Sequence, residues 1–232
     1  MITMKDLKSL INQTFGIENE LTGITRKEVA QKIADFFDTD LEYIGGGYRA
    51  YEIRDYSGRN WTVERDSSIY PESAHGCAGS DDYKVEIVSP ILKYDDINQL
   101  QELVRKIRKA GAFANSSCGI HVHVGAERFT PQTLRNIVNI IASKEDILYR
   151  ALKVDGQRIG YCKKTNEELI NAINKKKPKT MSELKEIWYA EDPQNTWQHY
   201  NRTRYHGLNL HAKIKKKTIE FRLFNSTTHA GE

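Results

Sequence analysis

The chain has 232 residues, of which 39% are hydrophobic and 28% charged. This balance is typical of a folded globular protein, excludes a disordered chain, and suits one large domain. No apolar run reaches the ~20 residues that a membrane-spanning helix needs, and residues 1–30 lack the pattern of a signal or transit peptide. We therefore expect a cytoplasmic protein with no membrane partner.

The net charge of +4 permits contact with nucleic acid but does not require it. The excess lysines lie mainly in two runs, 175–179 and 213–217, in which no aromatic residues alternate with the lysines. We interpret these runs as solvated faces or a loop and expect no nucleic-acid partner. The three cysteines are an odd number at unpatterned spacing, which argues against a disulfide framework and for a reducing compartment.

The first half of the chain alternates short helices with strands. Thr25 and Glu28 form a capping box at a helix start, Pro90 ends a strand, and Gly111 ends a helix. These signals and the hydrophobic periodicity predict a helix at 3–12, a strand at 15–21, a helix at 25–37, a strand at 41–44, a hairpin of 49–55 and 60–65, a loop at 71–82 over the site, a strand at 83–89, and a helix from Asp95 or Asp96 to Ala110.

The second half contains longer helical stretches. Thr130-Pro131 is a strong helix start, Thr165 with Glu168 forms a second capping box, and a further helix should follow Thr180 or Ser182. The elements that we predict are a strand at 118–125, a helix at 130–152, a polar helical stretch at 156–192, a loop at 198–205, a strand at 207–212, a lysine-rich turn, and a strand at 218–224. Residues 156–205 have the character of an insert or lid, and we can assign no chemistry to them.

Residues 118–125, Cys-Gly-Ile-His-Val-His-Val-Gly, alternate apolar and polar side chains. A period of two indicates a strand, so His121 and His123 point the same way from a rigid element. This arrangement can present two imidazoles to a metal or to a phosphate. A histidine pair on a solvated strand face gives the same pattern.

Other strands also carry ionisable residues at this spacing. Glu18 and Glu20 share one strand face, where they repel each other unless a cation or an arginine lies between them. A solvent-facing edge strand is the alternative explanation. Glu220 and Arg222 share a face of the last strand, where they can simply neutralise each other. Glu86 adds a carboxylate on a fourth strand.

Together these residues predict one site on one sheet. The apolar strand faces must pack against helices, which leaves the polar faces together on the other side. We therefore expect an α+β fold in which a curved antiparallel sheet gathers the polar residues on an open concave face. Several carboxylates with a histidine suit Mg²⁺ or Mn²⁺, and an arginine with a second histidine suits a polyphosphate. The residues indicate a metal–nucleotide site in which an arginine stabilises charge.

The chain resembles the amidoligase family in four motifs that occur in the same order: Gly-Ile-Glu-Asn-Glu, Val-Glu-Ile-Val-Ser-Pro, Cys-Gly-Ile-His-Val-His-Val-Gly and Thr-Ile-Glu-Phe-Arg-Leu-Phe. That family is similar to the wider glutamine synthetase / glutamate–cysteine ligase superfamily of carboxylate–amine ligases. The resemblance covers about residues 14–227. It implies a half-open barrel like the glutamine synthetase catalytic domain, with helices on the outer face, as a single catalytic domain over 1–232.

The resemblance also implies an activity, namely that ATP phosphorylates a substrate carboxylate and an amine then displaces phosphate, with Mg²⁺ or Mn²⁺ as cofactor. The substrates would be amino acids, peptides or peptidoglycan-like molecules. The implied roles are metal ligands for Glu18, Glu20, Glu86, His121 and Glu220, approach to the ATP phosphates for His123, stabilisation of the transferring phosphoryl group for Arg222, and polar contacts in the phosphate and substrate region for Arg202, Arg204 and Asn209. Glu86, Glu220 and Arg222 are the implied catalytic residues.

Two features depart from the family pattern. Asp66-Ser67-Ser68-Ile69 resembles a glutamine synthetase segment near the amine site, but that segment precedes the Glu-x-Glu strand and this one follows it. The family usually continues with helical sequence after the last motif, so we expect a C-terminal helical part to be missing from this chain.

Three other functions fit part of the pattern. A cupin-like metal-dependent oxygenase or isomerase would use the histidine pair with a glutamate, and a zinc hydrolase would use Cys118, His121 and His123. A non-catalytic nucleotide- or peptide-binding module would have the same pocket without turnover. The identity of the carboxylate and amine, and the oligomeric state, cannot be read from the sequence.

Overall fold

The computed structural model describes residues 9–198 and 200–231, which divide into two compact units. The first unit contains the residues up to Val122 together with the tail from Asn225, and the second runs from His123 to Phe224. Strand β6 (Gly119–Gly125) contributes residues to both units. Each unit has a hydrophobic core of its own.

The first unit contains an antiparallel sheet that matches the predicted strands closely. Its strands follow the order β2-β3-β4-β5-β1, with the first half of β6 next to β1. The strand bounds are Phe15–Leu21 for β1, Leu41–Gly45 for β2, Ala50–Arg54 for β3, Asn60–Glu64 for β4 and Val85–Val88 for β5. The strand predicted at 83–89 is shorter because its first residue belongs to a 3₁₀ turn, η1 (Asp81–Tyr83). The four pairings among β1 to β5 are antiparallel, as predicted.

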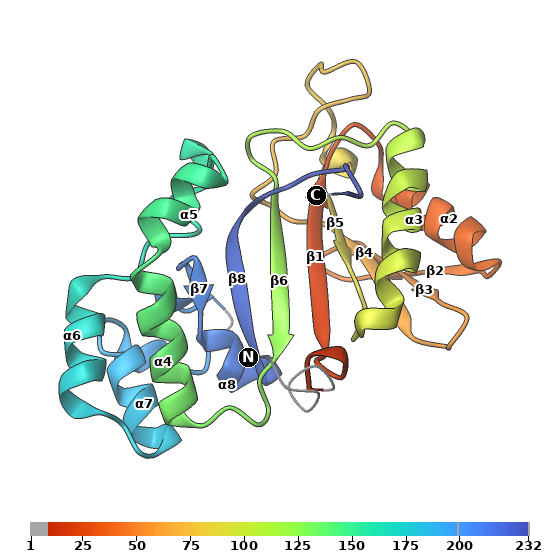
Figure 1. Ribbon diagram of the computed structural model, residues 1–232. Coiled ribbons are helices and arrows are strands. Elements are labelled where there is room, and N and C mark those ends of the chain that lie inside the picture. Colours follow the sequence, from red (N-terminus) through yellow and green to blue (C-terminus); the bar gives the residue numbers. More distant parts are fainter. Residues whose placement is uncertain (1–8, 199, 232) are drawn as a thin grey trace. The chain divides into compact units, whose positions relative to one another are not determined.

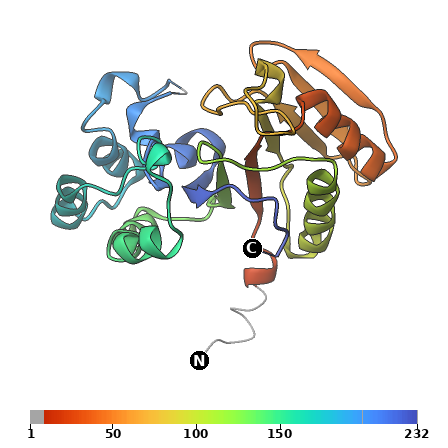
Figure 2. The ribbon, with the colours of Figure 1, turned by 90° about the horizontal axis from the view of Figure 1, so that it is seen from above.

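Helices α2 (Arg26–Phe37) and α3 (Ile97–Lys109) lie on the same side of these strands (Figure 2). The predicted capping box of Thr25 and Glu28 is present at the start of α2. The ring of Phe37 packs 5.8 Å from that of Trp61 on β4, so α2 closes the core over the middle of the sheet. Of the helix predicted at 3–12, only 9–12 lies within the described residues, and 9–11 is helical.

Helix α3 begins after Asp96, its N-cap residue, as predicted, but the expected capping hydrogen bond is absent. A 3₁₀ turn, η2 (Tyr94–Asp96), precedes the helix, and Asp96 makes no capping hydrogen bond to it. The Asp96 carboxylate instead accepts from the backbone N–H of Lys93 at 2.7 Å and pairs with Arg59 at 2.9 Å. The donors that Asp96 contacts are thus Lys93 and Arg59 and not the first backbone N–H groups of α3.

The second unit packs helices against a short sheet. Helix α4 contacts α6, and α6 contacts α7 (Figure 1). Side chains from these helices share one core with β7 and β8, including Leu134, Ile173, Ile187, Leu208 and Ile219. The bounds are Pro131–Ala142 for α4, Glu145–Ala151 for α5, Glu167–Lys176 for α6, Met181–Trp188 for α7, Leu208–Asn209 for β7, His211–Lys216 for α8 and Thr218–Asn225 for β8. Much of the segment 156–205 therefore belongs to a core.

Three predictions for this unit are wrong. The helix expected at 130–152 is two helices, since Ser143 bonds back to the Ile140 carbonyl and α5 begins only at Glu145. The strand expected at 207–212 is reduced to β7, and the lysine-rich turn is helix α8. Lys213 on α8 donates to the Ala126 carbonyl at 2.5 Å, a contact distant in sequence that no local pattern signals.

The predicted cap of the helix at 167–176 is also wrong. The cap is Asn166, whose side chain accepts from Leu169 N at 2.7 Å. Thr165 instead donates its backbone N–H and its hydroxyl to the buried carboxylate of Glu145. The capping box at Thr180 does form, with Glu183. In the described part of the chain, no helix combines the length and the apolar character needed to cross a bilayer.

Gly23, which follows β1, provides a test of the packing in the first unit. Its φ is +83°, and a Cβ there would lie 2.4 Å from the Phe113 ring and 2.7 Å from the Gly111 carbonyl oxygen. Gly58 has a similar φ of +74° but open space around it. Alanine at either position adopts a left-handed backbone at a cost of roughly 1–2 kcal/mol, and only Gly23→Ala adds a collision.

We expect Gly23→Ala to lower the free energy of unfolding by about 2 kcal/mol more than Gly58→Ala. Urea unfolding of the two variants measures the difference. Equal losses would show that Phe113 and its neighbours move aside without cost.

Candidate functional site

The histidines of β6 are buried, unlike those of a solvated strand face. His121 is 3% exposed and His123 is 7% exposed. Val122 and Val124, which alternate with them, are only half-buried. Buried imidazoles need polar partners, so the partners of each histidine define the candidate site. His121 belongs to the first unit and His123 to the second.

Three glutamates of the first unit share a face of its sheet. Glu20 on β1 lies directly opposite Glu86 on β5, and Glu18 is two residues earlier on β1. All three are buried. Ile17 and Ile87, which alternate with them, point to the opposite face, where α3 packs. The predicted division into a helix-covered apolar face and a polar face is therefore present in this unit.

His121 contacts both glutamates of β1. Its Nδ1 lies 3.0 Å from Glu18 Oε2, and its Nε2 lies 3.6 Å from Glu20 Oε1. The other oxygen of Glu20 accepts the backbone N–H of Gly119 at 2.6 Å. These contacts hold the carboxylates toward β6, because β6 and β1 are neighbouring strands.

The arrangement of these groups suits a divalent cation. One ligand atom from each of Glu18, Glu86 and His121 lies within 4.8 Å of the other two. Burial, together with the negative charges of Glu18, Asp66 and Glu20, raises the pKa of Glu86 well above its usual range. A bound cation stabilises the ionised form of a buried carboxylate that has other negative charges around it. Two carboxylates and one imidazole form a donor set that fits Mg²⁺ or Mn²⁺.

Asp66 completes a second group of possible ligands. Oxygens of Glu20, Asp66 and Glu86 also lie within 4.8 Å of one another, so Glu86 belongs to both groups. The sequence order of the Asp66 segment argues against a glutamine synthetase-like role, yet the fold brings it beside Glu20. The sequence pattern that points to Asp66 is strand alternation. Glu64 pairs with Glu86, and Asp66 is two residues after Glu64, past the end of β4.

The second unit gathers another set of the predicted residues around Glu220. Asn209 on β7 pairs with Glu220 on β8 and donates to its Oε2 at 2.6 Å. Arg222 donates to the other oxygen of Glu220, and His123 Nε2 lies 3.8 Å from that oxygen. His123 Nδ1 is 2.9 Å from the Thr218 hydroxyl. All four ionisable or amide side chains, Asn209, Glu220, Arg222 and His123, are buried.

The two remaining arginines occupy a different position in this unit. Arg202 and Arg204 begin and end a 3₁₀ turn, η5 (Arg202–Arg204). The Arg202 side chain is exposed, and Arg204 lies over the rings of Tyr200 and Tyr205, at 5.2 and 5.7 Å from their centroids. Their predicted contact with phosphate stays a prediction.

The zinc hydrolase alternative requires Cys118 to join the histidines. Cys118 is buried and its thiol donates to Asn115 Oδ1 at 3.3 Å. Strand alternation also places residue 118 on the opposite side from residue 121. Among the described residues, no ligand group found by distance contains this cysteine. The geometry therefore favours oxygen-rich over thiolate coordination.

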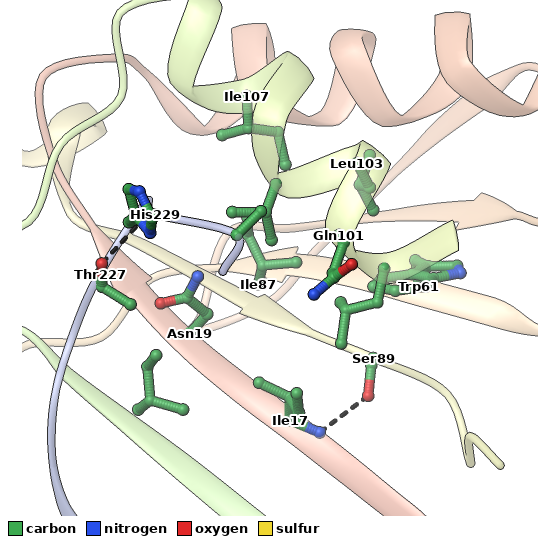
Figure 3. Close-up of a pocket in the computed structure, with 14 residues that line it drawn as sticks. Ile17, Asn19, Trp61, Ile87, Ser89, Gln101, Leu103, Ile107, Thr227 and His229 are labelled. Atoms are coloured by element: carbon green, nitrogen blue, oxygen red, sulfur yellow. Dashed lines mark hydrogen bonds between the residues drawn. The ribbon is translucent and has the colours of Figure 1, made fainter. Parts of the chain in front are cut away.

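An apolar pocket lies on the other face of the first unit (Figure 3). It is lined by Ile17 and Ile87 of the sheet, by Leu103 and Ile107 of α3, and by the tail at 227–230. Ser89 at its edge accepts the backbone N–H of Ile17 at 2.8 Å. No described residue that lines this pocket is a carboxylate, so the pocket is separate from the glutamate cluster and does not suit a cation.

The site of the first unit is thus a buried group of glutamates and a histidine on the sheet of an α+β chain, with an oxygen-rich set of possible ligands. A family model described as "Putative amidoligase enzyme" matches residues 11–232, and the chain belongs to this family. Membership indicates ligase activity on carboxylate and amine substrates. No curated protein and no solved structure matches the chain.

The raised pKa of Glu86 predicts how stability depends on pH. A carboxyl whose pKa is higher in the folded than in the unfolded state destabilises the fold as pH rises above the unfolded value of 4.5. In metal-free protein, Glu86→Gln should therefore raise the melting temperature near neutral pH. Its advantage should shrink as pH falls and vanish below 4.5, where the wild-type carboxyl is protonated in both states.

Thermal melts in chelator across this pH range measure the effect. Glu102→Gln, at an exposed position of α3, is the matched control and should change little at any pH. A Glu86→Gln variant less stable than wild type at neutral pH would contradict the account.

Proposed function

We propose that this chain is an ATP-dependent carboxylate–amine ligase that forms an amide or isopeptide bond. The observation that carries the proposal is the buried group of Glu18, Glu86 and His121. Buried carboxylates that face one another are costly in a purely structural role. In a family of amidoligase enzymes, a cation that accompanies a nucleotide accounts for the cost.

The proposed reaction has two steps. An oxygen of the substrate carboxylate bonds to the γ-phosphorus of ATP as the bond to ADP breaks, which gives an acyl phosphate. The nitrogen of the amine then bonds to the acyl carbon, phosphate leaves with the electron pair of its bond to that carbon, and the nitrogen loses a proton. Since phosphoryl transfer depends mainly on positioning and charge stabilisation, the protein needs fixed cationic groups more than a nucleophile.

The cation would be held by Glu18, Glu20, Glu86 and His121, and Asp66 is a further candidate ligand. Glu220 is the metal ligand that we propose in the second unit. When bound, Mg²⁺ or Mn²⁺ offsets the negative charge of a triphosphate. The contact of His121 Nδ1 with Glu18 orients the imidazole. The hydrogen bond from Asn209 to Glu220 orients that carboxylate in the same way.

Charge stabilisation is the role that we propose for Arg222. A guanidinium that is already bonded to Glu220 is fixed before the reaction begins, and fixed donors stabilise developing charge without reorganisation. We propose that His123, Asn209, Arg202 and Arg204 contact the phosphates or the substrate.

The substrates that we propose are amino acids, peptides or peptidoglycan-like molecules. None of the three cysteines, all of them among the described residues, forms a disulfide, and a cytoplasmic location stays our prediction. A non-catalytic nucleotide-binding module would show cation and nucleotide binding with no phosphate release. The half-open barrel of glutamine synthetase remains our prediction for the fold.

If the chain is a ligase, cation binding and turnover should depend on different residues. Glu86→Gln should weaken Mn²⁺ binding at least tenfold or so, because a charged ligand is lost. Arg222→Lys should leave Mn²⁺ affinity unchanged and lower ATP-dependent phosphate release about a hundredfold, since a lysine cannot make the same fixed contacts. Electron paramagnetic resonance measures Mn²⁺ binding, and phosphate release is measured with pooled amino acids and peptides.

Glu102→Gln and Arg150→Lys, both at exposed helix positions, are the matched controls and should match wild type in both assays. Wild-type protein that releases no phosphate and gains no thermal stability from Mg-ATP would reject the ligase. Retention of Mn²⁺ affinity in Glu86→Gln would reject the proposed cation site.

A further inference from the structure

Strand β8 of the second unit is longer than its neighbour β7. The two residues of β7, Leu208 and Asn209, pair with Phe221 and Glu220. One residue further along, the backbone N–H of Arg222 donates to the Gly207 carbonyl at 2.8 Å. Alternate residues of a strand turn their backbone groups to the same edge. The carbonyls of Arg222 and Phe224 therefore face an edge that β7 no longer covers, and a backbone carbonyl buried there needs a donor.

The side chain of Arg158 supplies the donors. Its Nη2 donates to the Arg222 carbonyl at 2.8 Å, and its Nη1 donates to the Phe224 carbonyl. The residue is 3% exposed. A rigid guanidinium that bonds two carbonyls two residues apart acts as a substitute for the missing strand. A lysine has no such fork and cannot reproduce this geometry.

The segment that carries Arg158 is itself fixed. The carbonyl of Arg158 accepts the backbone N–H of Cys162 at 3.1 Å and its thiol at 3.2 Å. The Cys162 carbonyl accepts the hydroxyl of Tyr149 at 2.5 Å. Burial raises the pKa of both the Tyr149 hydroxyl and the Cys162 thiol, so neither group ionises near neutral pH. The backbone of Arg158 is thus held by Cys162, a neutral residue that is itself hydrogen-bonded to Tyr149.

The same segment also reaches the side chain of Arg222. The Tyr161 carbonyl accepts the Arg222 Nε–H at 3.4 Å. Arg222 is therefore held at its backbone by Arg158 and at its side chain by Tyr161, three residues further on. The opposite end of the guanidinium bonds Glu220. A tether at both backbone and side chain restricts the directions in which the guanidinium can point.

We propose that Arg158 is a positioning residue for Arg222. It fixes the end of β8 so that the Arg222 guanidinium keeps one orientation, and it makes no contact with the substrate itself. The inference rests on the role that we propose for Arg222 in the ligase reaction. It also assigns a function to a residue in the segment 156–205, where the sequence indicates no chemistry.

The experiment compares Arg158→Lys, Arg222→Lys and the double variant, with Arg150→Lys as control. We expect Arg158→Lys to lower kcat about tenfold and to change the KM for ATP less than about twofold, since orientation is lost but binding groups remain. In the Arg222→Lys background, the second change should lower kcat less than twofold, because the group that Arg158 positions is already gone. Arg150→Lys, at an exposed position of α5, should match wild type.

Two results would overturn the proposal. One is an unchanged kcat in Arg158→Lys, and the other is a double variant in which the two losses multiply, as they would if Arg158 only stabilised the fold. Melting temperatures of all variants identify any loss of folded protein.

A nuclear magnetic resonance measurement needs no turnover and separates this inference from the ligase proposal. The Nε–H signal of Arg222, assigned by its loss in Arg222→Lys, should shift and exchange faster with solvent in Arg158→Lys and stay unchanged in Arg150→Lys. A wild-type protein without ATP turnover but with this shift would reject the ligase and retain the positioning of Arg222. An unchanged signal would reject the positioning.

Discussion

Repulsion among buried carboxylates is the constraint on which the site of the first unit depends. Glu20 and Glu86 occupy paired positions on neighbouring strands, and Glu18 shares their face. Like charges in a medium of low dielectric constant repel strongly, and this repulsion adds to burial in raising the pKa of Glu86. His121 and the Gly119 amide offset part of this repulsion. The rest of the unit, an apolar core under α2 and α3, stabilises a strand arrangement that the charges alone would not keep.

The residues of the site were predictable wherever a single strand sets the direction of a side chain. Side chains alternate between the two faces of a strand, so the order of residues alone tells which of them share a face. The sequence therefore places Glu18 with Glu20, and Glu220 with Arg222, on common faces. The structure confirms both placements, within the first unit and within the second. Caps formed between neighbours, such as Thr25 with Glu28, were predictable for the same reason.

Features that depend on contacts between distant residues were not predictable. Thr165 bonds to the distant Glu145 while Asn166 caps α6, and Lys213 of α8, where a turn was predicted, bonds to the distant Ala126. Arg158 lies in a polar stretch with no motif, and its role follows only from the two carbonyls of β8 that it meets. Asp66 is an intermediate case, since alternation from Glu64 points to it but the family order of motifs argues against it.

The central claim is that buried carboxylates and an imidazole of the first unit hold a divalent cation. Anomalous X-ray scattering from crystals grown with Mn²⁺ tests it most directly, because the signal locates the ion without reference to activity. The account predicts a peak among the side chains of Glu18, Glu86 and His121. A peak only at other side chains, or none at saturating Mn²⁺, would contradict it.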